Sequence, residues 1–278
     1  MKNFARSLTL FLMTLALLVF AACEPSGSGV DEYDVDTGFL FSGVSSARVF
    51  YPGNIAELDN VGATTLSSGM GGTKEGMYWL AEPLAEAGFV VMAISASDNM
   101  TVNGYENAHQ AGLDLLQEAN QNSRSPLYGK LGRYGIIGYS KGGGAVINTA
   151  SELGDAVDTC VALAPWSPNP TSNHSAATMI LTGTADVIAP AYMGAGAYDD
   201  LPADVPRLYA SMRGESHLYW NSLYSTGSET EFITAWLKYY LEDDQAYYDV
   251  FANGPGSDMT DYEFDPGDSG GGSPGGCN

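Results

Sequence analysis

The chain has 278 residues, 45% of them hydrophobic, which is enough to bury the core of one large domain or two small ones. Asp and Glu number 33 against 11 Lys and Arg, giving a formal net charge of −22 at pH 7. An acidic surface of this kind repels phosphate backbones, so nucleic acid is not expected as a partner.

The first 22 residues resemble an export signal. Lys2 and Arg6 precede an apolar stretch over 8–20, and two alanines stand directly before Cys23. We expect cleavage before Cys23, lipid on that cysteine and a membrane tether over 23–32, which would anchor the protein in the cell envelope. Ordinary secretion stays open because Phe20 departs from the usual lipoprotein signal. A membrane-spanning anchor is disfavoured because the apolar stretch is short.

Short apolar runs typical of buried strands recur along the chain. They lie at residues 47–51, 63–67, 89–95, 134–138, 159–163, 178–182 and 207–212. Apolar residues at helical spacing predict helices over 73–87, 105–120 and 228–241. The alternation of strands and helices predicts one α/β domain over 33–264, with a mostly parallel sheet covered by helices on both faces. Residues 265–278 are rich in Gly and Ser and are expected to form a disordered tail.

Two further cysteines bear on the redox state of the chain. Cys160 lies inside an apolar run and is expected to be a buried free thiol, whereas Cys277 is the penultimate residue and is expected to be exposed. The sequence therefore predicts no internal disulfide.

The pentapeptide GYSKG at 138–142 lies between a predicted strand and the helix-prone segment 143–153. A serine on a sharp turn from strand to helix is the nucleophile elbow of the α/β-hydrolase fold, and small residues at both ends tolerate its strained backbone. The pattern G-x-S-x-G occurs again at 267–271 and 271–275, where no apolar run flanks it. Context therefore selects Ser140 as the nucleophile.

A serine hydroxyl needs a base to take its proton, and the base needs a carboxylate to fix its tautomer. Only His217 follows the last predicted strand, where this fold places its base. We expect His109 on a helix face and His174 in a solvated loop. Asp186 directly follows the strand at 178–182, whereas the competing aspartates lack that placement. The sequence therefore predicts Asp186 as the carboxylate.

Two backbone amides are needed to bind the oxyanion of the tetrahedral intermediate. One belongs to Lys141, the residue after the nucleophile, and the other is expected in the glycine-rich loop at 68–72, after an early strand.

Several stretches in order resemble the bacterial polyester hydrolases of the cutinase branch, the α/β-hydrolase group that contains poly(ethylene terephthalate) hydrolases and dienelactone-hydrolase-like proteins. The resemblance covers residues 47–264, and its matching stretches are 82–91, 125–130, 138–144, 164–166, 186–190 and 214–217. It implies a serine hydrolase of carboxylic esters, and we expect the enzyme to work through an acyl-enzyme as a monomer, with no cofactor or metal. Polyesters are among the substrates implied.

Carried over by position, the resemblance implies Ser140, Asp186 and His217 as the catalytic triad. It likewise implies the amides of Met70 and Lys141 as the oxyanion donors. Tyr139 and Trp166 would flank the scissile ester.

The chain departs from the group's pattern at three positions, and the first two leave polymer binding open. Met70 stands where these enzymes usually have an aromatic residue, Lys141 where they usually have Met, and Asn253 where some have a disulfide cysteine. The Lys141 side chain could favour anionic or polar acyl chains, or it could point to solvent. The alternatives to polyester hydrolysis are a carboxylesterase or lipase for small esters, and an inactive scaffold that serves as a surface binding lipoprotein.

Overall fold

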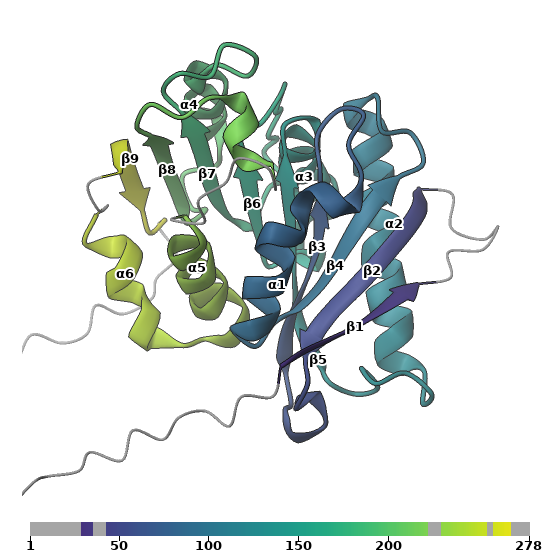
Figure 1. The fold of residues 1–278 in the computed structure, drawn as a ribbon. Coiled ribbons are helices and arrows are strands. Elements are labelled where there is room, and N and C mark those ends of the chain that lie inside the picture. Colours follow the sequence, from purple (N-terminus) through teal and green to yellow (C-terminus); the bar gives the residue numbers. More distant parts are fainter. Residues whose placement is uncertain (1–28, 36–42, 222–228, 255–257, 268–278) are drawn as a thin grey trace, which may run out of the picture.

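A nine-stranded sheet runs through the part of the chain that the structure describes, with helices against both of its faces (Figure 1). The computed structural model describes residues 29–35, 43–221, 229–254 and 258–267. The predicted export signal, Cys23 and Cys277 lie outside the described residues, as does most of the predicted tail. No helix within the described ranges has both the length and the apolar character needed to cross a bilayer.

The sheet is parallel in its centre and antiparallel at both edges. Its order is β1-β2-β4-β3-β5-β6-β7-β8-β9, and the antiparallel pairs are β1·β2, β2·β4 and β8·β9. The strands are β1 (Val30–Val35), β2 (Val44–Pro52), β3 (Val61–Ser67), β4 (Val90–Ala96), β5 (Leu131–Tyr139), β6 (Thr159–Leu163), β7 (Ala177–Gly183), β8 (Arg207–Met212) and β9 (Met259–Asp265). All seven predicted strands are present. Six of them, β3 to β8, have at least one parallel neighbour and are largely buried, so their sequences are apolar runs. The seventh, β2, is antiparallel to both neighbours and only partly buried.

The edge strands β1 and β9 were not predicted from the sequence. Each has an exposed face, so its residues alternate in burial and show no continuous apolar run. β1 begins at Val30, which places the last residues of the predicted tether in the sheet, and β9 extends to Asp265 at the start of the predicted tail.

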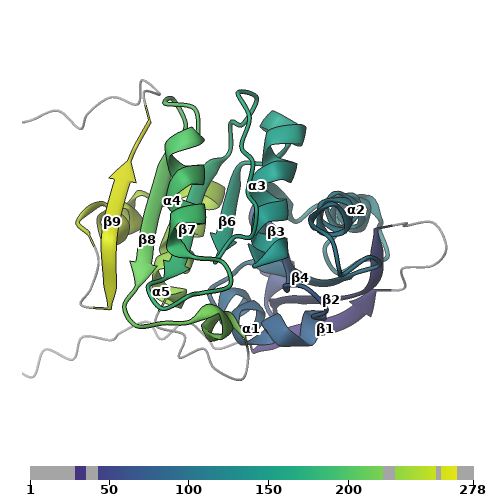
Figure 2. The same cartoon turned by 90° about the horizontal axis from the view of Figure 1, so that it is seen from above.

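Among the described residues, six α-helices form two layers, with α1, α5 and α6 on one face of the sheet and α2, α3 and α4 on the other (Figure 2). They are α1 (Tyr78–Glu86), α2 (Val102–Gln121), α3 (Lys141–Leu153), α4 (Ala191–Asp200), α5 (Thr230–Glu242) and α6 (Tyr248–Ala252). Short 3₁₀ turns are η1 (Ile55–Glu57), η2 (Lys74–Met77), η3 (Gly154–Ala156), η4 (His217–Trp220) and η5 (Gln245–Tyr247). The predicted helix over 73–87 is thus divided into η2 and α1, while α4, with two glycines and weak helix propensity, was not predicted.

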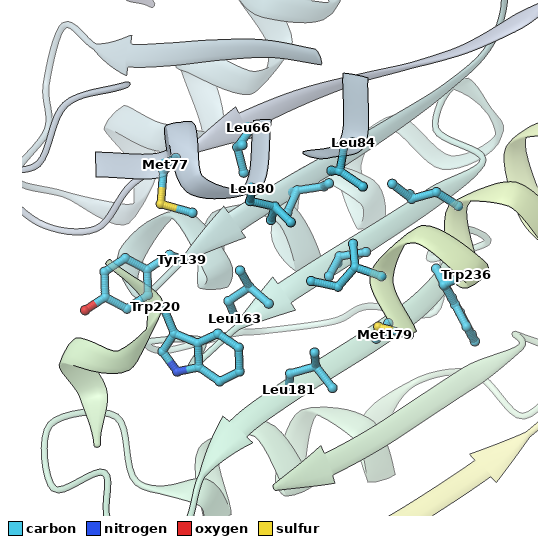
Figure 3. Packing of buried hydrophobic residues seen from close by; sticks show 14 of the residues in the cluster. Leu66, Met77, Leu80, Leu84, Tyr139, Leu163, Met179, Leu181, Trp220 and Trp236 are labelled. Carbon is cyan, nitrogen blue, oxygen red and sulfur yellow. The ribbon is translucent and has the colours of Figure 1, made fainter. Parts of the chain in front are cut away.

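The core under α1 and α5 fixes the sheet behind the candidate site (Figure 3). Leu66, Leu163 and Leu181 come from three parallel strands and are fully buried in this cluster. Trp236 of α5 is also fully buried, and its Nε1 donates to Thr159 Oγ1 at 2.8 Å. Close packing of this kind makes the sheet a rigid support. Because the parallel strands end at the same edge, the loops after β3, β5, β7 and β8 emerge together.

Candidate active site

Ser140 lies on the turn between β5 and α3, as the sequence predicted. Its φ is 57° and its ψ is −116°, a strained conformation for a residue with a side chain. A Cβ on Gly138 would lie 2.2 Å from the carbonyl oxygen of Gly142, and a Cβ on Gly142 would lie 2.3 Å from Ser67 Oγ. The turn therefore needs glycine at both ends, which is the physical reason for the G-x-S-x-G pattern here.

Backbone hydrogen bonds hold this turn against the neighbouring strand. The amide of Ser140 donates to the carbonyl of Leu163 at 2.8 Å, and the carbonyl of Ser140 accepts from the amide of Trp166 at 2.8 Å. The same carbonyl accepts from the amide of Gly144 at 2.9 Å, inside α3. These bonds compensate for the strained dihedral angles and direct the serine side chain out of the sheet edge.

A continuous chain of hydrogen bonds links Ser140, His217 and Asp186. Ser140 Oγ lies 2.8 Å from His217 Nε2, and His217 Nδ1 lies 2.7 Å from Asp186 Oδ2. Since a carboxylate can only accept, Nδ1 carries the proton and Nε2 is free to accept the serine proton. All three side chains are buried. The structure therefore brings together the three residues that the sequence singled out from three different loops.

The Asp186 carboxylate is fixed on both oxygens. Its Oδ2 accepts from His217, while its Oδ1 accepts from the amides of Ile188 and Ala189, each at 2.8 Å. The side chain is fully buried. An ionised carboxylate satisfied in this way orients the imidazole and stabilises the imidazolium when it forms.

Tyr139 contacts His217 through both its hydroxyl and its ring. Its hydroxyl donates to the backbone carbonyl of His217 at 2.8 Å, and the two ring centroids lie 5.1 Å apart. Burial raises the pKa of the Tyr139 phenol, which therefore stays a neutral donor. The residue thus contributes to the position of His217 as well as to the wall of the cleft.

A cleft of about 430 Å³ opens over Ser140. It is lined by Ser68, Gly69, Met70, Gly72, Tyr139, Ser140, Lys141, Trp166, Ile188, His217, Leu218 and Asn221. All the residues predicted to bind substrate or to supply oxyanion donors are among them. Sequence reasoning missed Ile188 and Leu218, although each is an apolar residue within two positions of Asp186 or His217. Both side chains are about half exposed, which is unusual for apolar residues and indicates a binding surface. This exposure is visible only in the folded structure, so the sequence alone carried no sign of it.

The loop at 68–72 lies directly against the serine. A Cβ on Gly69 would lie 2.7 Å from Ser140 Cβ and 3.3 Å from Ser140 Oγ, so glycine is required here too. Lys141 is the first residue of α3, and the amide of a first helical residue has no acceptor inside its own helix. The two segments predicted to supply oxyanion donors therefore meet at Ser140.

Lys141 crosses to another loop instead of extending freely into solvent. Its Nζ donates to the carbonyl of Met100 at 2.6 Å, in the loop between β4 and α2. Of the described residues that line the cleft, Lys141 is the one with a permanent charge. In the same loop, hydrogen bonds from the Thr101 hydroxyl and the Met100 amide lower the pKa of Asp98, and the charge of Lys141 adds a smaller contribution. The one permanent charge among these lining residues is therefore bonded to a backbone carbonyl of the neighbouring loop.

The other two histidines are structural. His109 on α2 is fully buried beneath the loop at 68–72, with Nδ1 2.7 Å from Thr65 Oγ1 and Nε2 2.8 Å from Ser67 Oγ. Burial lowers its pKa to about 3, so the ring is neutral at pH 7. It joins α2 to the end of β3, from which that loop begins.

The prediction of a solvated loop for His174 is wrong. The side chain is buried because its loop folds back against α3 and β7, and its ring lies 2.9 Å from Ser151 Oγ and 2.7 Å from Thr178 Oγ1. Burial lowers its pKa to about 4. Cys160, beside Thr178, is a buried free thiol as predicted, and burial raises its pKa to about 12. In the part of the chain that the structure describes, no group of three or more His, Cys, Asp or Glu side chains is arranged to hold a metal ion.

The sheet order, the strained serine turn and the chain of hydrogen bonds through histidine to aspartate define a serine hydrolase of the α/β-hydrolase fold. Comparison with known proteins narrows this class. The chain belongs to the PET hydrolase-like family, whose sequence model matches residues 26–266. The predicted resemblance is therefore confirmed, and the chain is a serine ester hydrolase.

The curated relatives that the chain matches include proteins named as cutinases and as a terephthalate hydrolase. It is 30% identical over 223 residues to Cutinase 2 of Thermobifida cellulosilytica, covering 78% of this chain and 81% of that protein. It is 28% identical over 218 residues to Cutinase 1 of the same organism, covering 77% and 80%. It is 26% identical over 230 residues to a bis(hydroxyethyl) terephthalate hydrolase of Streptomyces coelicolor, covering 80% and 71%.

Proposed function

We propose that this protein hydrolyses carboxylic esters through an acyl-enzyme on Ser140 and that polyesters are its substrate class. The observation that carries the proposal is the unbroken hydrogen-bond chain from Ser140 through His217 to Asp186, which opens into a largely apolar cleft. The names of the relatives, cutinase and bis(hydroxyethyl) terephthalate hydrolase, support the substrate class.

The proposed reaction uses each member of the hydrogen-bond chain in turn. His217 Nε2 takes the proton of Ser140 Oγ as the oxygen attacks the ester carbonyl, and Asp186 stabilises the resulting imidazolium. The amides of Met70 and Lys141 donate to the oxyanion of the tetrahedral intermediate. His217 then protonates the departing alcohol, and the acyl group remains on Ser140. Water activated by His217 repeats the sequence and releases the acid.

The walls of the cleft suit an apolar acyl or aromatic group. Met70 is 58% exposed, and Ile188 and Leu218 are each 50% exposed at its rim. Trp166 and Tyr139 provide flat aromatic surfaces on the inner wall. Exposed apolar side chains of this kind gain free energy when an apolar substrate covers them. An insoluble polyester would cover the rim as well as the inner wall.

The first experiment is hydrolysis of p-nitrophenyl butyrate by the wild type and by Ser140→Ala. We expect the variant to lose on the order of 10⁴-fold in rate, because the nucleophile is absent. Ser151→Ala is the matched control, since it removes another buried serine hydroxyl from α3 outside the cleft and should keep most of the activity. Equal activity in the wild type and Ser140→Ala would refute the assignment of the nucleophile.

A second assay separates polyester hydrolysis from the small-ester alternative. Release of soluble acid from a polyester film is measured beside hydrolysis of a short soluble ester. The specific observation that favours the alternative is the flexible Met70 in place of an aromatic side chain at the rim. Fast cleavage of the soluble ester without any release from film would establish the alternative. Failure of Ser140 to react with a fluorophosphonate would instead support an inactive binding scaffold.

We also propose that the protein is exported and acts as a monomer. The support for export is the sequence of the first 22 residues and the cysteine that follows them. Labelling with a fatty-acid analogue, lost in Cys23→Ala, would establish the lipidated form, and release of unlabelled protein into the medium would establish ordinary secretion. Elution of the soluble domain as a dimer in gel filtration would contradict the monomer.

A further inference from the structure

The peptide group between Gly69 and Met70 is held from its carbonyl side. The carbonyl oxygen of Gly69 accepts two hydrogen bonds, one from the hydroxyl of Tyr105 on α2 and one from the amide of Gly72 at 2.8 Å. A carbonyl oxygen has two lone pairs, so both are used. This carbonyl is therefore fixed in direction by a turn within its own loop and by a side chain from a different element.

The direction of the carbonyl determines the direction of the Met70 amide. The described residues contain no cis peptide bond, so the C=O of Gly69 and the N–H of Met70 lie in one plane and point in opposite directions. With the carbonyl held towards Tyr105 on α2, the N–H points to the opposite side, away from α2. Met70 lines the cleft, so this direction is compatible with donation to an oxyanion there. Hydrogen bonds accepted by the carbonyl also polarise the peptide group and strengthen its N–H as a donor.

The same peptide group lies beside the nucleophile. Gly69 has no room for a Cβ, which would lie 2.7 Å from Ser140 Cβ. A rotation of this peptide group would therefore displace the Met70 N–H from the position where the oxyanion forms. The Gly72 amide closes the turn within the loop, and the second bond, from Tyr105 on a different element, adds a restraint against this rotation.

Tyr105 is itself fixed in place. It is fully buried in the first turn of α2, where burial raises the pKa of its phenol and keeps the hydroxyl proton available for donation. The helix begins at a defined residue, because the Thr101 hydroxyl accepts from the Gly104 amide at 3.0 Å as its N-cap. A Cβ on Gly104 would lie 2.0 Å from the carbonyl oxygen of Asp98, so the first turn packs closely on the preceding loop.

We propose that Tyr105 is a positioning residue for ester hydrolysis, which orients the Met70 amide as an oxyanion donor through the carbonyl of Gly69. This inference rests on the proposed function and adds to it a residue that touches neither the substrate nor Ser140. The oriented Met70 amide would stabilise the oxyanion, which forms only in the transition state, so substrate binding in the ground state should be nearly unchanged.

The test is Tyr105→Phe, which keeps the ring and removes the hydroxyl. We expect kcat for p-nitrophenyl butyrate to fall about 10- to 100-fold, with KM within about twofold of the wild type. This loss in rate is at most comparable to the loss caused by removing a whole oxyanion donor, about 10²- to 10³-fold. Affinity for a trifluoromethyl ketone, which forms a tetrahedral oxyanion on the serine, should fall by a similar factor. A purely structural role would lower the unfolding midpoint and leave kcat and this affinity unchanged.

Tyr262→Phe is the matched control, because the hydroxyl of Tyr262 also donates to a backbone carbonyl, that of Phe251 near the edge strand β9. It should lose comparable stability and keep kcat and inhibitor affinity. Wild-type kcat and inhibitor affinity in folded Tyr105→Phe would overturn the proposal. If Ser140→Ala also kept full activity, the proposed function would fail instead, so the two failures are distinguishable.

Should Tyr105→Phe not fold, Thr101→Val replaces it, since it removes the N-cap of the helix that carries Tyr105. A fall of about threefold or more in both kcat and inhibitor affinity supports the proposal, given the usual cost of a lost N-cap. Unchanged values of both overturn it.

Discussion

Two buried neutral histidines should make the protein sensitive to mild acid. His109 and His174 are both nearly inaccessible to water, and burial lowers their pKa values to about 3 and about 4 from an ordinary value of 6.5. Neither ring has a carboxylate as hydrogen-bond partner within the described ranges; their ring nitrogens bond to hydroxyls and a backbone carbonyl. Protonating either one in the folded state would therefore bury an uncompensated charge.

The sign of the pH effect follows from which state binds protons first. In the unfolded chain both histidines take up a proton below pH 6.5, whereas in the folded protein they resist until the pH falls to their lowered pKa values. Their contribution to stability is therefore full above pH 6.5 and is lost as the pH falls. The free energy of unfolding should fall by about 1.4 kcal/mol per pH unit for each histidine, or about 2 kcal/mol each between pH 7 and pH 5.

The assay is urea unfolding of the wild type, His109→Gln and His174→Gln at both pH values. About 0.5 M NaCl screens the change in net charge, which would otherwise act in the opposite direction by easing repulsion between carboxylates. Each variant can lose stability at pH 7, since the hydroxyls around its histidine lose a partner. The informative quantity is the difference in unfolding free energy between the two pH values, which should be about half as large in each variant as in the wild type.

The wild type should thus lose about 4 kcal/mol between pH 7 and pH 5, most of it from these two side chains. Equal losses in the wild type and both variants would refute the reasoning, because the acid sensitivity would then come from other groups. A wild type whose stability does not change over this interval would refute it as well.

Three further outcomes are expected. Gly138→Ala should lower the free energy of unfolding by about 1–3 kcal/mol or more and abolish ester hydrolysis, because its Cβ would lie 2.2 Å from a backbone oxygen. The control is Gly196→Ala in α4, where nothing lies within 4 Å of the new Cβ. Urea unfolding should show this control to be neutral or slightly stabilising. Lys141→Met removes the cation from the cleft and its bond to Met100, so kcat/KM for an ester with a carboxylate on its acyl chain should fall about fivefold relative to a neutral ester of the same length. If the ratio of the two kcat/KM values is the same in the variant and the wild type, the charge does not act on the substrate. With a net charge of −22, thermal stability should rise as NaCl increases from about 0.05 to about 1 M, and a midpoint independent of salt would contradict a role for charge repulsion.

Much of the fold and the choice of Ser140, Asp186 and His217 could be predicted from the sequence because the responsible signals are local. A strand buried on both faces leaves an apolar run, and all seven predicted runs are strands, although the antiparallel β2 is buried only in part. A strained turn between strand and helix needs glycines at fixed positions. The two matches in the tail have the same glycines, so GYSKG was distinguished from them by the apolar run before it and the helix-prone segment after it. The order of serine, aspartate and histidine followed from the positions of the strands that carry them.

Only the tertiary structure decided how the site is supported. The hydroxyl of Tyr105 meets a carbonyl 36 residues away, and the Lys141 ammonium meets one 41 residues away. A backbone carbonyl is present at every residue, so nothing in the sequence marks the one that a side chain will reach. The burial of His174 and the edge strands β1 and β9 likewise depend on what packs against them. Local sequence specifies the elements and the reactive residues, whereas contacts between distant segments exist only once packing has brought those segments together.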